Sequence, residues 1–111
     1  MLNRKKTYTK KLIRDKIPEI IGEKGAKFET RILKDKEFEK ELKKKLVEEA
    51  MEVEKEEVDI LNELADVLEL IISIGELKGV EFKEIKDKQE EKKVERGGFS
   101  KKLFLEWIEE N

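Results

Sequence analysis

Apolar residues recur every three or four positions through most of this chain, and this spacing predicts three long helices. They span about residues 36–54, 59–77 and 81–95. Apolar side chains cover most of the circumference of the second of these helices, so we expect it to be the central one. A short helix is expected before them, with Asp15 as its N-cap and its end near Gly25.

Two other segments are expected to form a small two-stranded β element. In 27–33, apolar and charged residues alternate, which is typical of a half-buried strand. The segment 102–108 is the predicted partner, because a lone strand has no neighbour with which to pair. The predicted fold class is therefore mainly α, in a single domain of residues 1–111 whose first ten residues form a basic, flexible arm.

The composition excludes several classes of function. The 26 Lys and Arg nearly balance the 28 Asp and Glu, for a net charge of −2. This balance does not favour a general electrostatic attraction to nucleic acid or anionic membranes, so neither is an expected partner. The absence of Cys and His excludes a disulfide scaffold, the usual zinc sites and a catalytic triad. An enzyme of this composition would use carboxylates, Lys, Arg and a bound metal.

Charged residues make up 49% of the chain, which is about twice the usual share. A mixture rich in both Lys and Glu is typical of a thermophile protein. No segment has the pattern of a signal peptide or a membrane span, so a cytoplasmic protein is expected. Because the apolar arc of the central helix is too wide for one small chain to cover, we expect a homodimer, with a tetramer as the alternative.

Two pairs of acidic residues lie on the first two long helices. A spacing of three places Glu49 with Glu52, and Glu63 with Asp66, on common helix faces. The pairs share a midpoint, since (49 + 66)/2 and (52 + 63)/2 both equal 57.5. If the helices pack antiparallel around a turn at 57–58, the four carboxylates converge.

Carboxylates that converge repel one another, and a bound cation would relieve this repulsion. Like charges about 4 Å apart repel by about 4 kcal/mol at an effective dielectric near 20. A set of oxygen ligands selects Mg²⁺ or Mn²⁺ over zinc. However, 28 of the 111 residues are acidic, so ordinary solvated side chains are the alternative interpretation.

Five motifs occur along the chain: KLIRDKIPEII at 11–21, TRILKDKEF at 30–38, EEAME at 48–52, ELAD at 63–66 and RGGF at 96–99. In these motifs and their order the chain resembles the MazG-like, all-α nucleotide pyrophosphohydrolase superfamily. The resemblance is greatest to its small phosphoribosyl-ATP pyrophosphohydrolase-like members.

The resemblance implies a MazG-like helical bundle that hydrolyses a nucleotide substrate to the monophosphate and pyrophosphate with Mg²⁺. A nucleoside triphosphate is the implied substrate, and a house-cleaning role against non-standard nucleotides is expected. The implied metal ligands are Glu49, Glu52, Glu63 and Asp66. Only ten residues separate Glu52 from Glu63, which is short for the family.

Four further residues are candidates with two interpretations each. Glu48 is either a catalytic general base that orients water beside the metal, or a solvated acid. Arg14 and Lys16 either form a basic wall of the substrate site or are solvated charges. Arg96 either stabilises a helix end that Gly97 terminates or binds a substrate phosphate.

Lys92 and Lys93, one helical turn before Arg96, are further candidates for substrate binding. Two alternatives to a general nucleotide pyrophosphohydrolase stay open. One is the phosphoribosyl-ATP pyrophosphohydrolase of histidine biosynthesis, and the other is a non-catalytic helical interaction protein whose acids only increase solubility.

Overall fold

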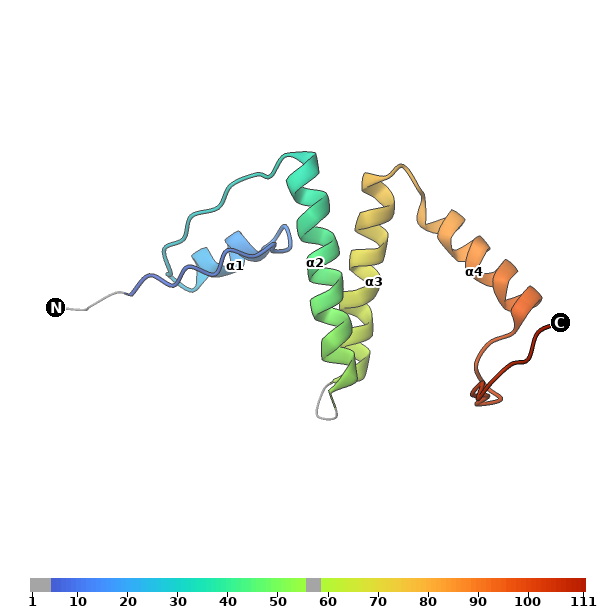
Figure 1. Cartoon of the computed structure of the whole chain (residues 1–111). Helices are drawn as coiled ribbons and strands as arrows, with labels where there is room; N and C mark the ends of the chain where they lie inside the picture. Colours follow the sequence, from blue (N-terminus) through green and yellow to red (C-terminus); the bar gives the residue numbers. More distant parts are fainter. Residues whose placement is uncertain (1–4, 56–58) are drawn as a thin grey trace.

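The computed structural model describes residues 5–55 and 59–111, and it is mainly helical. Two long helices pack side by side in opposite directions and form a central hairpin (Figure 1). This confirms the predicted antiparallel hairpin, whose turn at 57–58 lies outside the described residues. The helices are α1 (Ile17–Glu23), α2 (Asp35–Glu54), α3 (Ile60–Leu77) and α4 (Phe82–Arg96).

Local side-chain contacts explain where α3 and α4 begin. The Asp59 carboxylate accepts a hydrogen bond of 3.2 Å from the backbone N–H of Asn62, as an N-cap does. At the start of α4, the Glu84 carboxylate accepts a hydrogen bond of 3.1 Å from the backbone N–H of Glu81. The short helix α1 instead begins after Lys16, so the prediction of Asp15 as its N-cap was wrong.

The predicted β element does not form within the chain. Residues 27–33 connect α1 to α2 without regular secondary structure, and 102–108 follow α4 in the same way. The two segments lie on opposite sides of the hairpin (Figure 1). They therefore cannot pair with each other, and a strand without a neighbour leaves its backbone groups unpaired.

The chain buries little of its surface. Leu42 and Leu70, at 3% and 7% exposure, are the buried apolar side chains among the described residues. The accessible surface is 11273 Å², whereas a compact monomer of this mass exposes about 6,400 Å². The radius of gyration is 19.6 Å, against about 13 Å for a compact chain of this length. The reason is that α1 and α4 lie to either side of the hairpin instead of covering it (Figure 1).

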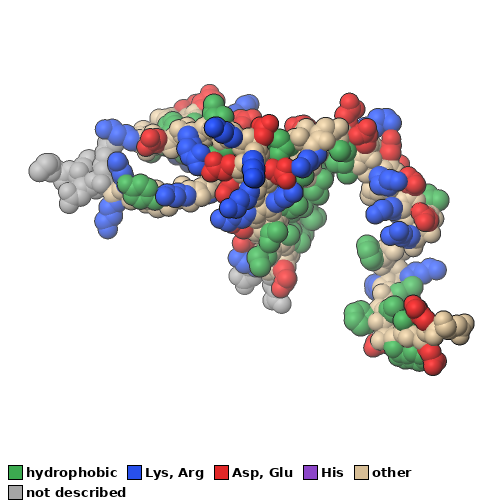
Figure 2. Space-filling model, turned by 45° about the horizontal axis from the view of Figure 1, so that its top comes forward, with side chains coloured by type: hydrophobic (Ala, Val, Ile, Leu, Met, Phe, Trp, Pro, Cys, Tyr) green, Lys and Arg blue, Asp and Glu red, His purple; other side chains and the backbone are tan. Residues whose placement is uncertain are grey.

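Apolar side chains are consequently uncovered over much of the molecule (Figure 2). On α3, Leu61, Leu64 and Leu68 are 77%, 51% and 44% exposed, which agrees with the wide apolar arc expected for this helix. A second apolar group follows α4 and consists of Phe99, Leu103, Phe104, Leu105, Trp107 and Ile108. None of the described helices combines the length and the apolar character needed to cross a lipid bilayer.

A tight turn around Gly75 joins α3 to α4. The backbone N–H of Val80 donates a hydrogen bond of 2.7 Å to the Gly75 carbonyl. A Cβ atom at residue 75 would lie 2.9 Å from the Val80 carbonyl oxygen and 3.0 Å from Cδ1 of Ile85. The turn closes because residue 75 has no side chain, and this close approach fixes the direction in which α4 leaves the hairpin.

Candidate metal centre

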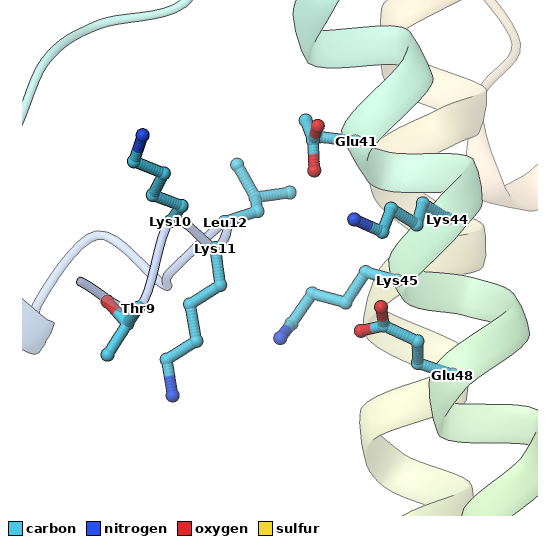
Figure 3. A pocket seen from close by; sticks show the side chains of 8 residues that line it. All are labelled: Thr9, Lys10, Lys11, Leu12, Glu41, Lys44, Lys45 and Glu48. Atoms are coloured by element: carbon cyan, nitrogen blue, oxygen red, sulfur yellow. The ribbon is translucent and has the colours of Figure 1, made fainter. Parts of the chain in front are cut away.

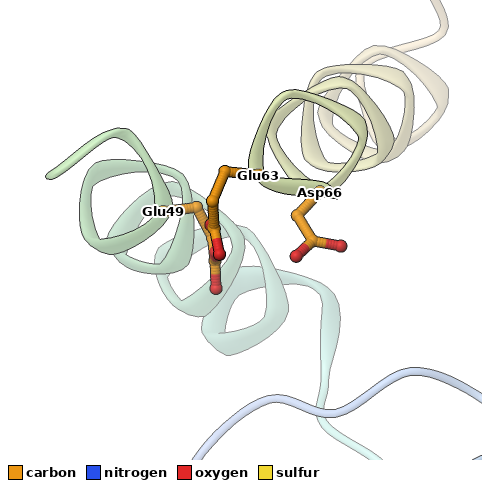
Figure 4. A group of neighbouring side chains, drawn as sticks. All are labelled: Glu49, Glu63 and Asp66. Atoms are coloured by element: carbon orange, nitrogen blue, oxygen red, sulfur yellow. The ribbon is translucent and has the colours of Figure 1, made fainter. Parts of the chain in front are cut away.

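Three carboxylates meet on one face of the α2–α3 hairpin (Figure 4). Glu49 comes from α2, whereas Glu63 and Asp66 come from α3. Each offers an oxygen atom, and these oxygens all lie within 4.8 Å of one another. All three residues are half-buried. The antiparallel packing brings Glu49 and Asp66 together from opposite helices, as their shared midpoint with the other acid pair predicts.

The environment of Glu63 is unfavourable for a charged side chain. Its Oε2 atom is buried and has no hydrogen-bond partner among the described residues. The pKa of Glu63 is raised, first because a shared hydrogen bond with Glu49 requires one of the two carboxyls to hold a proton. Burial and the negative charges of Glu49, Asp66 and Glu52 raise this pKa further. A cation placed among these oxygens would relieve both the repulsion and the missing partner.

Two of the four predicted ligands, Asp66 and Glu52, form ion pairs with basic residues. Asp66 Oδ1 lies 2.7 Å from Nη2 of Arg14, which reaches it from the segment before α1. Glu52, the fourth predicted ligand, is not a member of the converging group. Its carboxylate lies 2.9 Å from the ammonium of Lys55, and this hydrogen bond raises the pKa of Lys55.

Glu48 points into a separate pocket, although it is adjacent to Glu49 in the sequence. The pocket lies between α2 and the segment before α1 (Figure 3). Sequence reasoning missed the lysines of this pocket and placed Lys10 in the arm. The sequence carries no signal for it, since the run Lys-Lys-Leu at 10–12 and 44–46 also occurs at 101–103, outside the pocket. The pocket is lined by Thr9, Lys10, Lys11, Leu12, Glu41, Lys44, Lys45 and Glu48.

The structure does not bring the other predicted basic residues to the carboxylates. Lys16 is the exposed residue that precedes α1. Lys92, Lys93 and Arg96 are exposed on α4, which packs against α3 and no other described helix. Within one chain, α4 leaves the hairpin at the end far from its turn and lies to one side (Figure 1).

Comparisons with known proteins return no relatives: no protein-family model matches the chain, and neither curated proteins nor solved structures give a match. The geometry of the carboxylates and the motifs are therefore the features that bear on function.

Proposed function

We propose that this protein is a Mg²⁺-dependent nucleotide pyrophosphohydrolase that resembles MazG-like enzymes. Its substrate would be a nucleoside triphosphate, with non-standard nucleotides included, and its products the monophosphate and pyrophosphate. The observation that carries the proposal is the convergence of Glu49, Glu63 and Asp66 from two antiparallel helices. The motifs EEAME and ELAD, in which these residues lie, support the assignment of the reaction.

The chemistry of the donor set fits Mg²⁺, with Mn²⁺ as a substitute. All candidate ligands are carboxylate oxygens, which hard divalent cations prefer. The buried Oε2 atom of Glu63 accepts no hydrogen bond from any described residue, so it is available as a metal ligand. Glu49, Glu63 and Asp66 would hold the ion. Glu52 would join them by leaving Lys55, an exposed pair whose loss has a small energetic cost.

Bound Mg²⁺ supplies positive charge for the phosphate oxygens and makes a nearby water more acidic. In the reaction, the water oxygen forms a bond to a phosphorus atom, and the bond from that phosphorus to the departing pyrophosphate breaks. The released proton would pass to a carboxylate, for which the motif EEAME offers Glu48, whose side chain lines the adjoining lysine pocket. Arg14 pairs with Asp66 at 2.7 Å, so an ion would bind Asp66 in competition with this guanidinium.

The same proposal includes a homodimer. A single chain leaves Leu61, Leu64 and Leu68 exposed on the helix that is most apolar. A second copy that packs on this face would complete a MazG-like bundle and remove these side chains from water, at about 25 cal/mol for each Å² buried. The dimer could also bring residues of α4 to the carboxylates of the other chain, which the single chain does not do.

The decisive experiment measures pyrophosphate release by the purified full-length chain. The substrates are a panel of standard and modified nucleoside triphosphates together with phosphoribosyl-ATP, each with Mg²⁺, with Mn²⁺ or with EDTA. At least one nucleotide should be hydrolysed, and EDTA should abolish the reaction. Hydrolysis of phosphoribosyl-ATP alone would assign the protein to histidine biosynthesis instead.

A melting experiment separates an enzyme from an adaptor protein. Mg²⁺ at millimolar concentration should raise Tm, because an ion that binds only the folded state stabilises it by mass action. The Glu69→Gln variant is the control, since Glu69 is an exposed acid of α3 outside the converging group. No pyrophosphate release and no effect of Mg²⁺ on Tm would refute the proposal and leave the non-catalytic interaction protein.

A further inference from the structure

The lysine pocket between α2 and the segment before α1 has features of an anion site. Lys10 and Lys11 line the pocket from that segment, with their side chains directed to opposite sides, and Lys44 and Lys45 extend toward it from α2 (Figure 3). The pocket has a volume of about 280 Å³. Two chain segments more than thirty residues apart in the sequence therefore supply one concave, lysine-rich surface.

The charge of this pocket is not balanced from within. Four lysines face two glutamates, Glu41 and Glu48, so the formal charge of the lining is 4 − 2 = +2. None of the four lysines forms an ion pair with another residue in 5–55 or 59–111. In contrast, Lys43 on the same turn of α2 lies 2.8 Å from Glu39. The pocket thus concentrates positive charge in a chain whose net charge is −2.

The pocket adjoins the carboxylate group. Lys45 and Glu49 are four residues apart on α2, which is about 6 Å along the helix axis. The segment that supplies Lys10 and Lys11 continues to Arg14, whose guanidinium contacts Asp66. The same two chain segments therefore form the lysine pocket and one side of the candidate metal centre.

We infer that this pocket binds the phosphate chain of the substrate, with lysine ammonium groups as donors to the phosphate oxygens. The inference rests on the proposed function and adds the part of the substrate that each surface holds. Pockets for whole drug-sized ligands have volumes of about 300–1,000 Å³. A pocket of about 280 Å³ suits a di- or triphosphate group and leaves the sugar and base outside it.

The test uses inorganic tripolyphosphate as the probe and isothermal titration calorimetry on the full chain. EDTA is present throughout, so that no metal contributes. The wild type should bind the probe, and high salt should weaken the binding because the lysines are exposed to screening. Lys45→Met, which keeps an apolar stem, and Lys10→Ala should each weaken binding about tenfold or more, as the loss of a charge-assisted hydrogen bond does.

Lys43→Ala is the matched control, because it removes the same charge from the same turn but not from the pocket. Its affinity for tripolyphosphate should stay within about twofold of the wild type. Absence of binding by the wild type, or an equal loss in Lys43→Ala, would overturn the inference.

The outcomes also distinguish this inference from the proposed function. Nucleotide hydrolysis by the wild type with no binding of tripolyphosphate would overturn the inference and leave the proposed function supported. Binding of tripolyphosphate that depends on Lys10 and Lys45, without hydrolysis of any nucleotide, would support the pocket and count against the enzyme.

Discussion

The guanidinium of Arg14 lies 2.7 Å from the carboxylate of Asp66, although the two residues are 52 positions apart. This contact ties the segment before α1 to the central hairpin at the candidate metal centre. It also places a positive charge beside one oxygen of a carboxylate that a divalent cation would use. Arg14 and a metal ion therefore compete for the same carboxylate.

This competition predicts the effect of Arg14→Ala. Without the guanidinium, Asp66 is free to bind a cation, so the affinity for Mn²⁺ should rise about twofold to fivefold, as the loss of one exposed ion pair allows. Titration followed by electron paramagnetic resonance measures free Mn²⁺ directly. Lys24→Ala, which removes an exposed charge at the end of α1, is the control and should leave the affinity unchanged. A weaker affinity in Arg14→Ala would show that Arg14 supports the site instead.

Glu63→Gln should change activity and stability in opposite directions. Loss of a metal ligand should reduce the rate of pyrophosphate release about a hundredfold or more. In EDTA, the same variant should have a higher Tm than the wild type, because a neutral amide no longer repels Glu49 and Asp66. Asp66→Asn should show the same loss of rate, and Glu69→Gln should show neither effect. Wild-type rates in both Glu63→Gln and Asp66→Asn would disprove the metal assignment.

Glu39 predicts a specific dependence of stability on pH. Hydrogen bonds from Lys43 and then from Lys78 lower the pKa of Glu39 from 4.5 to about 2. A carboxyl whose pKa is lowered by folding stabilises the folded state at every pH above the pKa that it has in the unfolded chain. This contribution is lost as the pH falls from about 4.5 toward 2. The difference in Tm between the wild type and Glu39→Gln should therefore be present at pH 6 and disappear near pH 2.

The control for this measurement is a carboxyl that forms no ion pair with a lysine. Glu54→Gln serves this purpose, because Glu54 is exposed at the end of α2. A Glu39→Gln curve that runs parallel to the wild type down to pH 2 would show that the two lysine contacts do not contribute to stability.

The exposed apolar face of α3 predicts the assembly state. Leu61→Glu or Leu64→Glu should shift the protein from dimer to monomer in sedimentation equilibrium, because a charged side chain would be buried in the interface. Ile32, between α1 and α2, is 98% exposed, so Ile32→Glu is a control that introduces the same charge outside this face. A wild type that sediments as a monomer at all concentrations would rule out the dimer.

Arg96 lies at the end of α4, away from the carboxylates of its own chain. If it binds a substrate phosphate in the dimer, Arg96→Ala should reduce kcat/KM by one to three decades, as the loss of a charge-assisted hydrogen bond of about 1.5–3 kcal/mol or more implies. A mixture of the impaired Arg96→Ala and Asp66→Asn variants should then be more active than either alone, because each mixed dimer has one intact site. If Arg96 only stabilises the helix end, kcat/KM will not change and Tm will fall slightly.

The long helices were predictable because their determinants are local. Apolar periodicity located α2, α3 and α4 to within one residue of their observed bounds, and the midpoint of the acid pairs predicted that Glu49 would meet Asp66. Both results depend only on positions along a helix and on one antiparallel turn. The midpoint of the acid pairs did not predict that Glu52 would pair with Lys55. A residue three positions away on a helix is within reach, so Glu52 can contact either Lys55 or the other acids.

The features that were missed depend on contacts between distant segments. The alternation at 27–33 has a strand-like pattern, but its partner at 102–108 lies across the hairpin, and no local signal reports that separation. The lysine pocket arises because the segment around Lys10 lies against α2. The periodicity of α2 shows where Lys44 and Lys45 are on the helix, but not which segment faces them.

Because the tight turn at Gly75 sets the direction of α4, a small change at the turn has its largest effect at the far end of that helix. Helix α4 has 15 residues and is about 22 Å long. A rotation of about 10° at the turn would therefore displace Arg96 by about 4 Å at the far end, more than the length of a hydrogen bond. A Cβ atom at residue 75 would lie 2.9 Å from the Val80 carbonyl oxygen, so one added methyl group there would change the direction of α4 and the position of every residue beyond the turn.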